Sequence, residues 1–186
     1  MKSILDEHGH GYIFDTQIQF PTKSVTSSLK DSMKNMQSST LKEQCLLKPK
    51  LRSFVKFKDF TLLSSHVAKS MTFNERRILS KIRLGVLPIR LETGRYVKPP
   101  LLEAERTCYC DSGEIESEFH VLFGCNKYLV LREAWLSKLV IPENFNQMDF
   151  CDKMGLALNN AENIKYTAKY LLDVMDLRSK SDLLYY

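Results

Sequence analysis

The sequence predicts a mainly α-helical protein: a single domain of about six or seven helices with a small Cys/His-rich turn near its centre. Apolar residues recur at helical spacing in several stretches, and Gly or Pro residues separate these stretches. Of the 186 residues, 44% are hydrophobic, a globular composition that allows a sizeable core. Three of the five cysteines and one of the four histidines fall between Cys108 and Cys125.

Composition and charge restrict the classes of protein to which this chain can belong. The net charge of +5 permits an acidic partner without requiring one. The first residues lack the apolar run of a signal peptide, and no stretch approaches the roughly 18 to 20 apolar residues of a membrane span. Five unevenly spaced cysteines predict a reducing intracellular compartment, nucleus or cytoplasm, and metal binding rather than a disulfide framework.

Three regions follow from the residue pattern. Residues 1–47 are predicted to form an N-terminal arm, extended or a short strand, followed by an amphipathic helix. Residues 48–140 form a basic helical region that contains the Cys/His turn. Residues 141–186 form a C-terminal helical pair, and we expect its end, from Asp176 onward, to be frayed.

Several residues in these regions have two interpretations. His8 and His10 could bind a metal, but two solvated histidines beside flexible glycines are the preferred interpretation. The capping-box sequence Thr40-Leu-Lys-Glu43 predicts the start of a second helix within the first region. Cys45 and Cys151 are both interpreted as buried, inert thiols.

A helix preceding the Cys/His turn has clear boundaries in the sequence. Thr72-Phe-Asn-Glu75 is a capping box that opens it, and Ile78, Leu79 and Ile82 supply its apolar face. Gly85 is placed to end it. A short helix is expected before it, over residues 60–71, and a loop with one helical turn after it, over residues 86–107.

The helices after the turn are defined by apolar spacing. A helix over 126–139 places Tyr128, Leu131, Trp135 and Leu139 on one face. Trp135 could stack on a base, but a single Trp on a helical stripe is more often part of a core. A second helix is expected over 145–158, with caps at Asn159 and Asn160. The apolar face of the last helix is formed by Ile164, Ala168, Leu171 and Met175.

Positive charge is concentrated between Lys48 and Arg106, where 14 Lys/Arg stand against 5 Asp/Glu, a local excess of +9. Such a region attracts the phosphates of RNA or DNA with a strong dependence on salt. The alternative is a solvated surface that happens to be basic. Residues 48–60, which alternate basic and apolar residues, are explained equally well as a nucleic-acid strip or as a connector. The candidate nucleic-acid contacts are Arg76, Arg77, Lys81, Arg83, Arg90 and Arg95.

The segment 108–125 contains a candidate metal site made by Cys108, Cys110, His120 and Cys125. Both members of the Cys-x-Cys pair precede Asp111-Ser112-Gly113, a good turn sequence, so their thiolates can face a common point. A helix is expected after this turn, with its glutamates near the first turn and Gly124 at its end. On a continuous helix, residues five apart diverge by roughly 140°. Ending the helix at Gly124 lets Cys125 fold back toward His120.

A closed Cys3His set is typical of a structural zinc site, in which protein atoms fill all four positions. The spacing from His120 to Cys125 is common in zinc modules, whereas Cys-x-Cys is tighter than the usual Cys-x2–4-Cys. The alternative is that His120 is an ordinary helical histidine and the cysteines are reduced core thiols. Spacing alone does not choose between these interpretations.

The segment from Glu105 to Arg132 resembles the C-terminal region of non-LTR (LINE-type) retrotransposon polyproteins, downstream of the reverse transcriptase. That region runs roughly Cys-x2-Cys, an acidic stretch, His-x-Leu, Cys, Tyr and Arg, and is often described as a reverse-transcriptase zinc-binding region. The upstream run from Arg77 to Tyr96 is similar to the segment that precedes the cysteines in such elements. Weaker similarity is found in Gly-His-Gly-Tyr-Ile-Phe near the start and in residues 159–177.

The resemblance implies a detached retroelement tail with a zinc-knuckle-like centre, not an enzyme. No Tyr/Phe-Ala-Asp-Asp motif occurs, and 186 residues cannot hold a polymerase or an endonuclease. Cys108 is where the chain leaves the family pattern, because its pair is one residue shorter. No Ser/His/Asp or Cys/His catalytic set and no small-molecule substrate is evident. The leading hypothesis is nucleic-acid binding; the alternative is a helical interaction module or relic without that role, its oligomeric state open.

Overall fold

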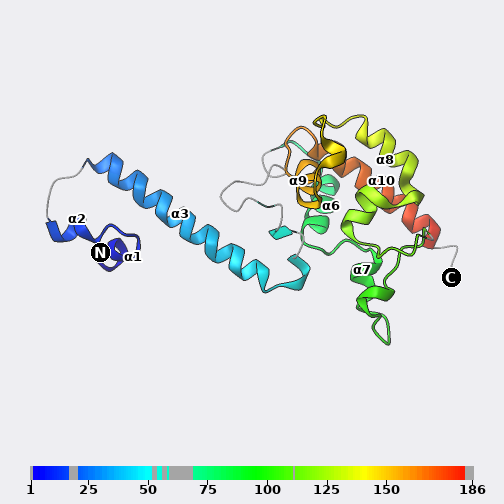
Figure 1. The fold of residues 1–186 in the computed structure, drawn as a ribbon, viewed down its shortest axis with the longest axis horizontal. Helices are drawn as coiled ribbons and strands as arrows, with labels where there is room; N and C mark the ends of the chain where they lie inside the picture. Colours follow the sequence, from blue (N-terminus) through cyan, green and yellow to red (C-terminus); the bar gives the residue numbers. More distant parts are fainter. Residues whose placement is uncertain are drawn as a thin grey trace. The chain divides into compact units, whose positions relative to one another are not determined.

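A computed structural model describes residues 2–16, 21–51, 54–55, 58, 69–110 and 112–182 of the chain. These residues belong to two compact units, one of which comprises the chain up to Leu47, while the other contains the described residues from Lys48 onward. Each unit is described by itself (Figure 1). The Cys/His turn belongs to the second unit.

The first unit is helical, so the expectation of an extended arm is wrong. It contains α1 (Lys2–Glu7), α2 (Gly11–Thr16) and α3 (Thr22–Leu46). Gly9 has a φ of +74° and makes the turn between α1 and α2, a conformation that glycine adopts at little cost. The glycines therefore divide two short helices rather than opening a flexible strand.

Helix α3 continues through Thr40, where the sequence predicted a new helix to begin. The Thr40 hydroxyl donates to the carbonyl of Met36, 3.0 Å away, instead of capping the following turn. Bonding to the carbonyl four residues earlier is the competing local geometry for a threonine within a helix. No residue of α3 is buried, and Cys45 near its end is half-buried.

In the second unit, α6 (Phe73–Arg83) has the boundaries that the sequence predicted. The Thr72 hydroxyl accepts from the amide of Glu75, and the Glu75 carboxylate accepts from the amide of Thr72, 2.7 Å away. At the other end Gly85 has a φ of +62°, and its amide donates to Ile82 while that of Val86 donates to Lys81. This is the Schellman arrangement, which satisfies the last carbonyls of a helix.

The segment that leads to the Cys/His turn is a loop, as expected, but it has two short helical turns instead of one. It contains α7 (Arg90–Thr93) and one 3-10 turn, Glu103–Glu105. After the turn come α8 (Leu129–Leu136), α9 (Phe150–Leu158) and α10 (Ile164–Asp182). The predicted helices 126–139 and 145–158 each begin with a separate 3-10 turn, so the α-helices are shorter than expected.

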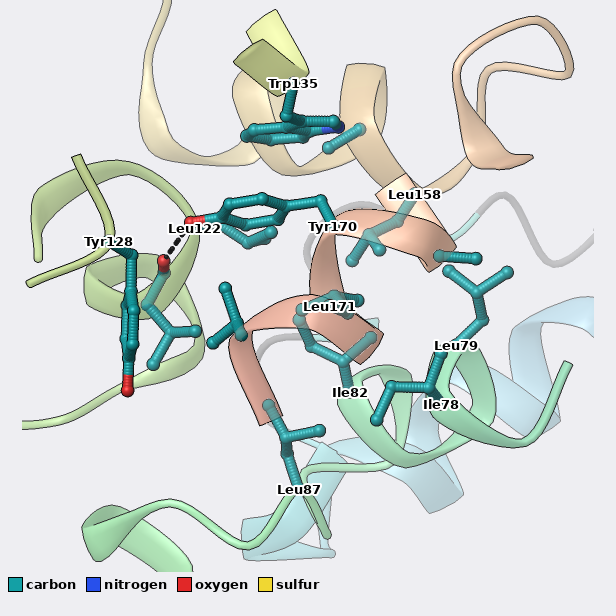
Figure 2. Close-up of a cluster of buried hydrophobic side chains, with 14 of the residues drawn as sticks. Ile78, Leu79, Ile82, Leu87, Leu122, Tyr128, Trp135, Leu158, Tyr170 and Leu171 are labelled. Carbon is teal, nitrogen blue, oxygen red and sulfur yellow. Dashed lines mark hydrogen bonds between the residues drawn. The ribbon is translucent and has the colours of Figure 1, made fainter. Parts of the chain in front are cut away.

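The core of the second unit is built around α10, which packs mainly against α6 and α8 (Figure 1). Figure 2 shows Ile82 of α6 beside Leu171 of α10, and the Tyr170 ring between α10 and Trp135 of α8. The rings of Trp135 and Tyr170 are stacked, with centroids 4.6 Å apart. Trp135 is therefore part of the core, and its indole donates to the Thr167 hydroxyl at 3.3 Å.

The C-terminal helix is longer than predicted. Residues from Asp176 to Asp182 continue α10 instead of fraying. Arg178 explains the difference, because its side chain is buried and bonded to the carbonyl of Pro88 and to the Glu116 carboxylate. Local sequence near a terminus does not reveal partners 62 and 90 residues away.

The fold class is confirmed as mainly helical. Within the described ranges no extended strand occurs; there is one isolated antiparallel bridge, between Thr107 and Ile115. These ranges contain more helices than the six or seven expected, because short helices replace parts of the arm and loops. No described helix is both long and apolar enough to cross a membrane. Residues 60–68 of the helix predicted before Thr72 lie outside the described residues, as do residues 52–53, 56–57 and 59–60 of the basic strip 48–60.

A candidate metal centre

The first two cysteines lie on a short antiparallel pairing that holds their backbone in place. Residues 106–108 run beside residues 114–116, with the bridge between Thr107 and Ile115 at the centre. Two backbone hydrogen bonds flank it, from Cys108 to Glu114 at 2.7 Å and from Glu116 to Arg106 at 2.9 Å. Gly113, with a φ of +72°, allows the chain to reverse between the two segments. Glu114 and Glu116 thus lie in an extended segment, so their predicted place in a helix is wrong, whereas Glu118 lies at the start of the helical turn that follows.

The other two candidate ligands lie at either end of a π-helical turn, His120–Gly124. The amide of Cys125 donates to the carbonyl of His120, five residues earlier, at 2.7 Å. A turn closed between residues five apart is wider than an α-helical turn, and such turns are frequent at functional sites. The π-turn places His120 and Cys125 near one another. The sequence correctly placed Cys125 just after the turn. What brings Cys125 near His120, however, is the wider π-turn and not the end of an α-helix at Gly124.

The four predicted ligands converge. One ligand atom from each of Cys108, Cys110, His120 and Cys125 lies within 4.8 Å of every other. The sulfur atoms of Cys108 and Cys125 are 3.6 Å apart, and Cys110 Sγ is 3.3 Å from His120 Nε2. Sulfur atoms bound to one zinc at about 2.3 Å lie about 3.8 Å apart in a tetrahedron. The donor set therefore fits one small metal ion with little movement.

The site is buried on one side and open on the other. Cys108, His120 and Cys125 are buried, whereas Cys110 is half-buried. The Glu114 side chain, which is 65% exposed, reaches His120 Nδ1 with its Oε2 at 2.6 Å. Both ring nitrogens of His120 therefore have a contact, one with a carboxylate and one with a thiol.

The thiols of Cys108 and Cys125 form a mutual hydrogen bond, in which either sulfur can be the donor. This hydrogen bond shifts the pKa values of the two thiols in opposite directions, raising that of Cys108 and lowering that of Cys125. Burial raises the pKa of both thiols. A cation bound by both sulfurs would displace their protons, because the thiolate is the form of cysteine that binds a metal.

The pKa values of the other two ligands, Cys110 and His120, are shifted by neighbouring groups. Burial raises the pKa of Cys110, but hydrogen bonds led by that with Ser112 outweigh it and lower the net value. Burial lowers the pKa of His120, but hydrogen bonds to Cys110 and Glu114 outweigh it and raise the net value. The lowered pKa of Cys110 favours the thiolate that binds a metal, whereas the raised pKa of His120 favours its protonated form, with which a metal would compete.

The predicted nucleic-acid contacts do not share one environment. Arg76 and Arg77 are exposed on α6, and Lys81 is half-buried. The Arg90 guanidinium lies over the ring of Tyr109, with 4.6 Å between its carbon and the ring centroid. Arg95 Nε is 3.6 Å from a carboxylate oxygen of Glu92.

Arg83 is separate from the exposed basic residues because its side chain is buried. Its Nη2 donates to the carbonyl of Leu158 at the end of α9 and to Asn159 Oδ1 at 3.2 Å. Burial lowers its pKa to about 10. A cation at a helix C-terminus is stabilised by the free carbonyls and the helix dipole. Arg83 thus joins α6 to α9 and is not available on the surface.

Glu114 and Glu116 contact groups in and around the site, and the sequence analysis wrongly predicted both to lie in a helix. Glu114 contacts His120, while the buried Glu116 accepts from Arg178 and from the amide of Arg90. Alternating glutamates over 114–118 are a period-two signal for an extended segment. The helical interpretation overrode that signal, because Ile115, Phe119 and Leu122 also fit helical spacing.

No protein-family model, curated protein or solved structure matches the chain. The resemblance to the C-terminal region of retrotransposon polyproteins therefore remains a prediction from the sequence. The candidate site is defined by its own geometry, a Cys3His cluster on a hairpin-like pairing and a π-turn.

Proposed function

We propose that Cys108, Cys110, His120 and Cys125 bind one zinc ion in a structural site. The observation that carries the proposal is the convergence of three sulfurs and one imidazole nitrogen within 4.8 Å. Zinc favours tetrahedral sites of thiolate and imidazole, and a set with four protein ligands leaves no open position for a reacting water. The five cysteines are free thiols, so none of these ligands is consumed by a disulfide.

The ion would cross-link two segments that have few other contacts with the hydrophobic core in the stretch between them. Cys108 and Cys110 belong to the pairing after the α7 loop, and His120 and Cys125 to the turn that leads to α8. Residues 112–117 contribute little apolar burial, since Ile115 is the half-buried residue packed against the core there. Metal–ligand bonds supply stability where hydrophobic burial is small.

Zinc content of the purified protein tests the site directly. The wild-type chain should carry one zinc per molecule, and Cys125→Ser should lose it because a hydroxyl is a poor zinc ligand at neutral pH. Cys151→Ser is the matched control, since this half-buried cysteine lies on α9, outside the ligand set. Metal-free wild-type protein with unchanged helicity, purified in the presence of zinc, would refute the proposal.

We further propose that the chain is a retroelement-derived fragment that binds RNA or DNA through exposed basic residues of α6 and the loop after it. The support is the local charge excess of +9 between Lys48 and Arg106 and the exposure of Arg76 and Arg77 on one helix. Phosphates would be the main contacts, because guanidinium groups bind them with little regard to sequence. A helical interaction module without nucleic-acid binding is the alternative outcome.

Fluorescence anisotropy with labelled RNA and DNA at two salt concentrations separates these outcomes. Affinity should fall as salt rises, and the double variant Arg76→Gln/Arg77→Gln should reduce the salt slope by about two, one for each lost phosphate contact. The double variant Lys138→Gln/Lys180→Gln removes the same charge from exposed positions outside the basic region. Absent binding at low salt, or equal effects of the two double variants, would favour the interaction module.

A further inference from the structure

The two nitrogens of the His120 ring face different groups. Nε2 points into the ligand set, 3.3 Å from Cys110 Sγ. Nδ1 faces away from it, 2.6 Å from Oε2 of Glu114. The imidazole is 3% exposed, while the Glu114 side chain is 65% exposed. An exposed glutamate is thus held against a buried ring on the side away from the sulfurs.

An ionised carboxylate only accepts hydrogen bonds, so its contact with Nδ1 places the ring proton on Nδ1. In the neutral ring the lone pair then lies on Nε2, the nitrogen that is 3.3 Å from Cys110 Sγ. A carboxylate that accepts from the far nitrogen also fixes the orientation of the ring and increases the basicity of the ligand nitrogen. The contact therefore selects which nitrogen can bind a metal.

The chain positions Glu114 by its backbone. Its carbonyl accepts from the amide of Cys108 at 2.7 Å, and its amide contacts the Ser112 hydroxyl at 3.2 Å. The same residue thereby pairs with one candidate ligand through its main chain and with another through its carboxylate. This double role places Glu114 between the two halves of the cluster.

Gly124 leaves the room in which this contact forms. A Cβ atom at position 124 would lie 3.1 Å from His120 Nδ1 and 3.4 Å from Glu114 Oε2. The first distance is too short for an ordinary contact, so any larger residue would press on the hydrogen-bonded pair. Gly124 does not have a positive φ. Its role is therefore space for the pair and not an unusual backbone conformation.

We infer that Glu114 is a positioning residue of the metal site, which holds the proton of His120 on Nδ1 and presents Nε2 to the ion. This inference rests on the proposed zinc site and assigns a role to a residue outside its ligand set. Gly124 leaves room for the same contact.

Zinc affinity measured by chelator competition gives the first test. Glu114→Ala should weaken binding by about 10- to 100-fold, the range found when such outer partners are removed. Glu114→Gln should lose less, because its amide oxygen can still accept from Nδ1. Gly124→Ala should weaken binding without changing any charge. Glu143→Gln, which removes an exposed carboxylate outside the site, should bind zinc as the wild type does.

The ring tautomer gives a second readout that a general loss of stability would not move. Long-range ¹H–¹⁵N spectra of the zinc-loaded wild type should show the His120 proton on Nδ1 and the metal on Nε2. Metal bound through Nδ1, or Glu114→Ala with wild-type affinity, would overturn the inference while leaving the zinc site intact. A wild-type chain without zinc would instead overturn the site itself. Circular dichroism of each variant checks that the helices are retained.

Discussion

The guanidinium of Arg178 donates to the carboxylate of Glu116, with Nη2 and Oε2 3.1 Å apart. Both side chains are buried, at 8% and 1% exposure. The Nε of Arg178 also donates to the carbonyl of Pro88 at 3.1 Å, and Glu116 accepts from the amide of Arg90 at 2.5 Å. One carboxylate thus connects the end of α10, the start of α7 and the segment between the candidate metal ligands.

Replacing Arg178 by methionine should destabilise the second unit strongly. The substitution keeps much of the side-chain volume but removes the Arg178 cation from the buried Glu116 carboxylate, and breaking a buried pair in this way costs about 3–5 kcal/mol of unfolding free energy. Urea denaturation measures the change. Lys180→Met is the control, since Lys180 pairs with Asp176 on the same helix in an exposed position and its loss should matter little. Similar small effects of both substitutions would contradict this role of Arg178.

Gly85→Ala should destabilise the protein for two separate reasons. The φ of +62° strains any residue with a side chain, and the new Cβ would lie 2.3 Å from the backbone carbonyl oxygen of Lys50. Gly113→Ala separates these causes, because Gly113 has a φ of +72° but open space around it. We expect Gly113→Ala to cost about 1 kcal/mol and Gly85→Ala distinctly more in urea denaturation. Equal costs would show that the close contact is relieved without strain.

Glu92 should make stability depend on pH in the acid range. Burial raises its pKa, but hydrogen bonds from Lys50 Nζ at 2.6 Å and the Tyr96 hydroxyl at 2.9 Å outweigh burial, so the folded pKa is lowered. Its contribution is therefore fully present above the unfolded pKa of about 4.3 and lost as pH falls through the lower folded value.

Comparison of the wild type with Glu92→Gln isolates this contribution, because the other titrating groups cancel in the difference. The difference in unfolding free energy should be constant near neutral pH and shrink as the pH falls below about 4.3. Chemical denaturation at a series of pH values measures it. A difference that does not change with pH would show that the Lys50–Glu92 pair adds no stability to the ionised form.

Removing zinc should lower the melting temperature. A ligand that binds only the folded chain stabilises it by about 4 kcal/mol when its free concentration is a thousand times its dissociation constant. Differential scanning fluorimetry with excess zinc and then with a chelator measures the shift. Cys125→Ser should melt at the same temperature in both conditions. A wild-type protein whose melting temperature is also the same with zinc and with the chelator would show that the cluster is a set of core thiols.

Several local features of the fold could be predicted because their causes lie within a few residues. The capping box of Thr72 and Glu75 and the Schellman end at Gly85 use only neighbouring backbone groups. The buried faces of α8 and α10 follow from apolar spacing, as Trp135 and Leu171 show. The four members of the Cys/His cluster could also be predicted, since few residue types bind zinc and all four lie within eighteen positions.

Other features depended on partners that the local pattern does not reveal. The end of α10 is ordered by contacts of Arg178 that span 62 and 90 residues. Arg83 looks like one more surface arginine in the sequence, yet it is buried against the end of α9. The segment 113–117 fits both helical and extended spacing, and its backbone pairing with residues 106–108 decides for the extended form.

The sequence by itself determined the helical class, the boundaries of α6 and the four residues that can bind a metal, because capping, periodicity and ligand chemistry act over short distances along the chain. Only the tertiary structure decided that a π-turn brings Cys125 to His120, that Glu114 faces the ring, and that Arg83 and Arg178 are buried. These outcomes depend on which polar groups become neighbours once water is excluded. The identity of one residue does not specify which residue will lie beside it in the folded protein.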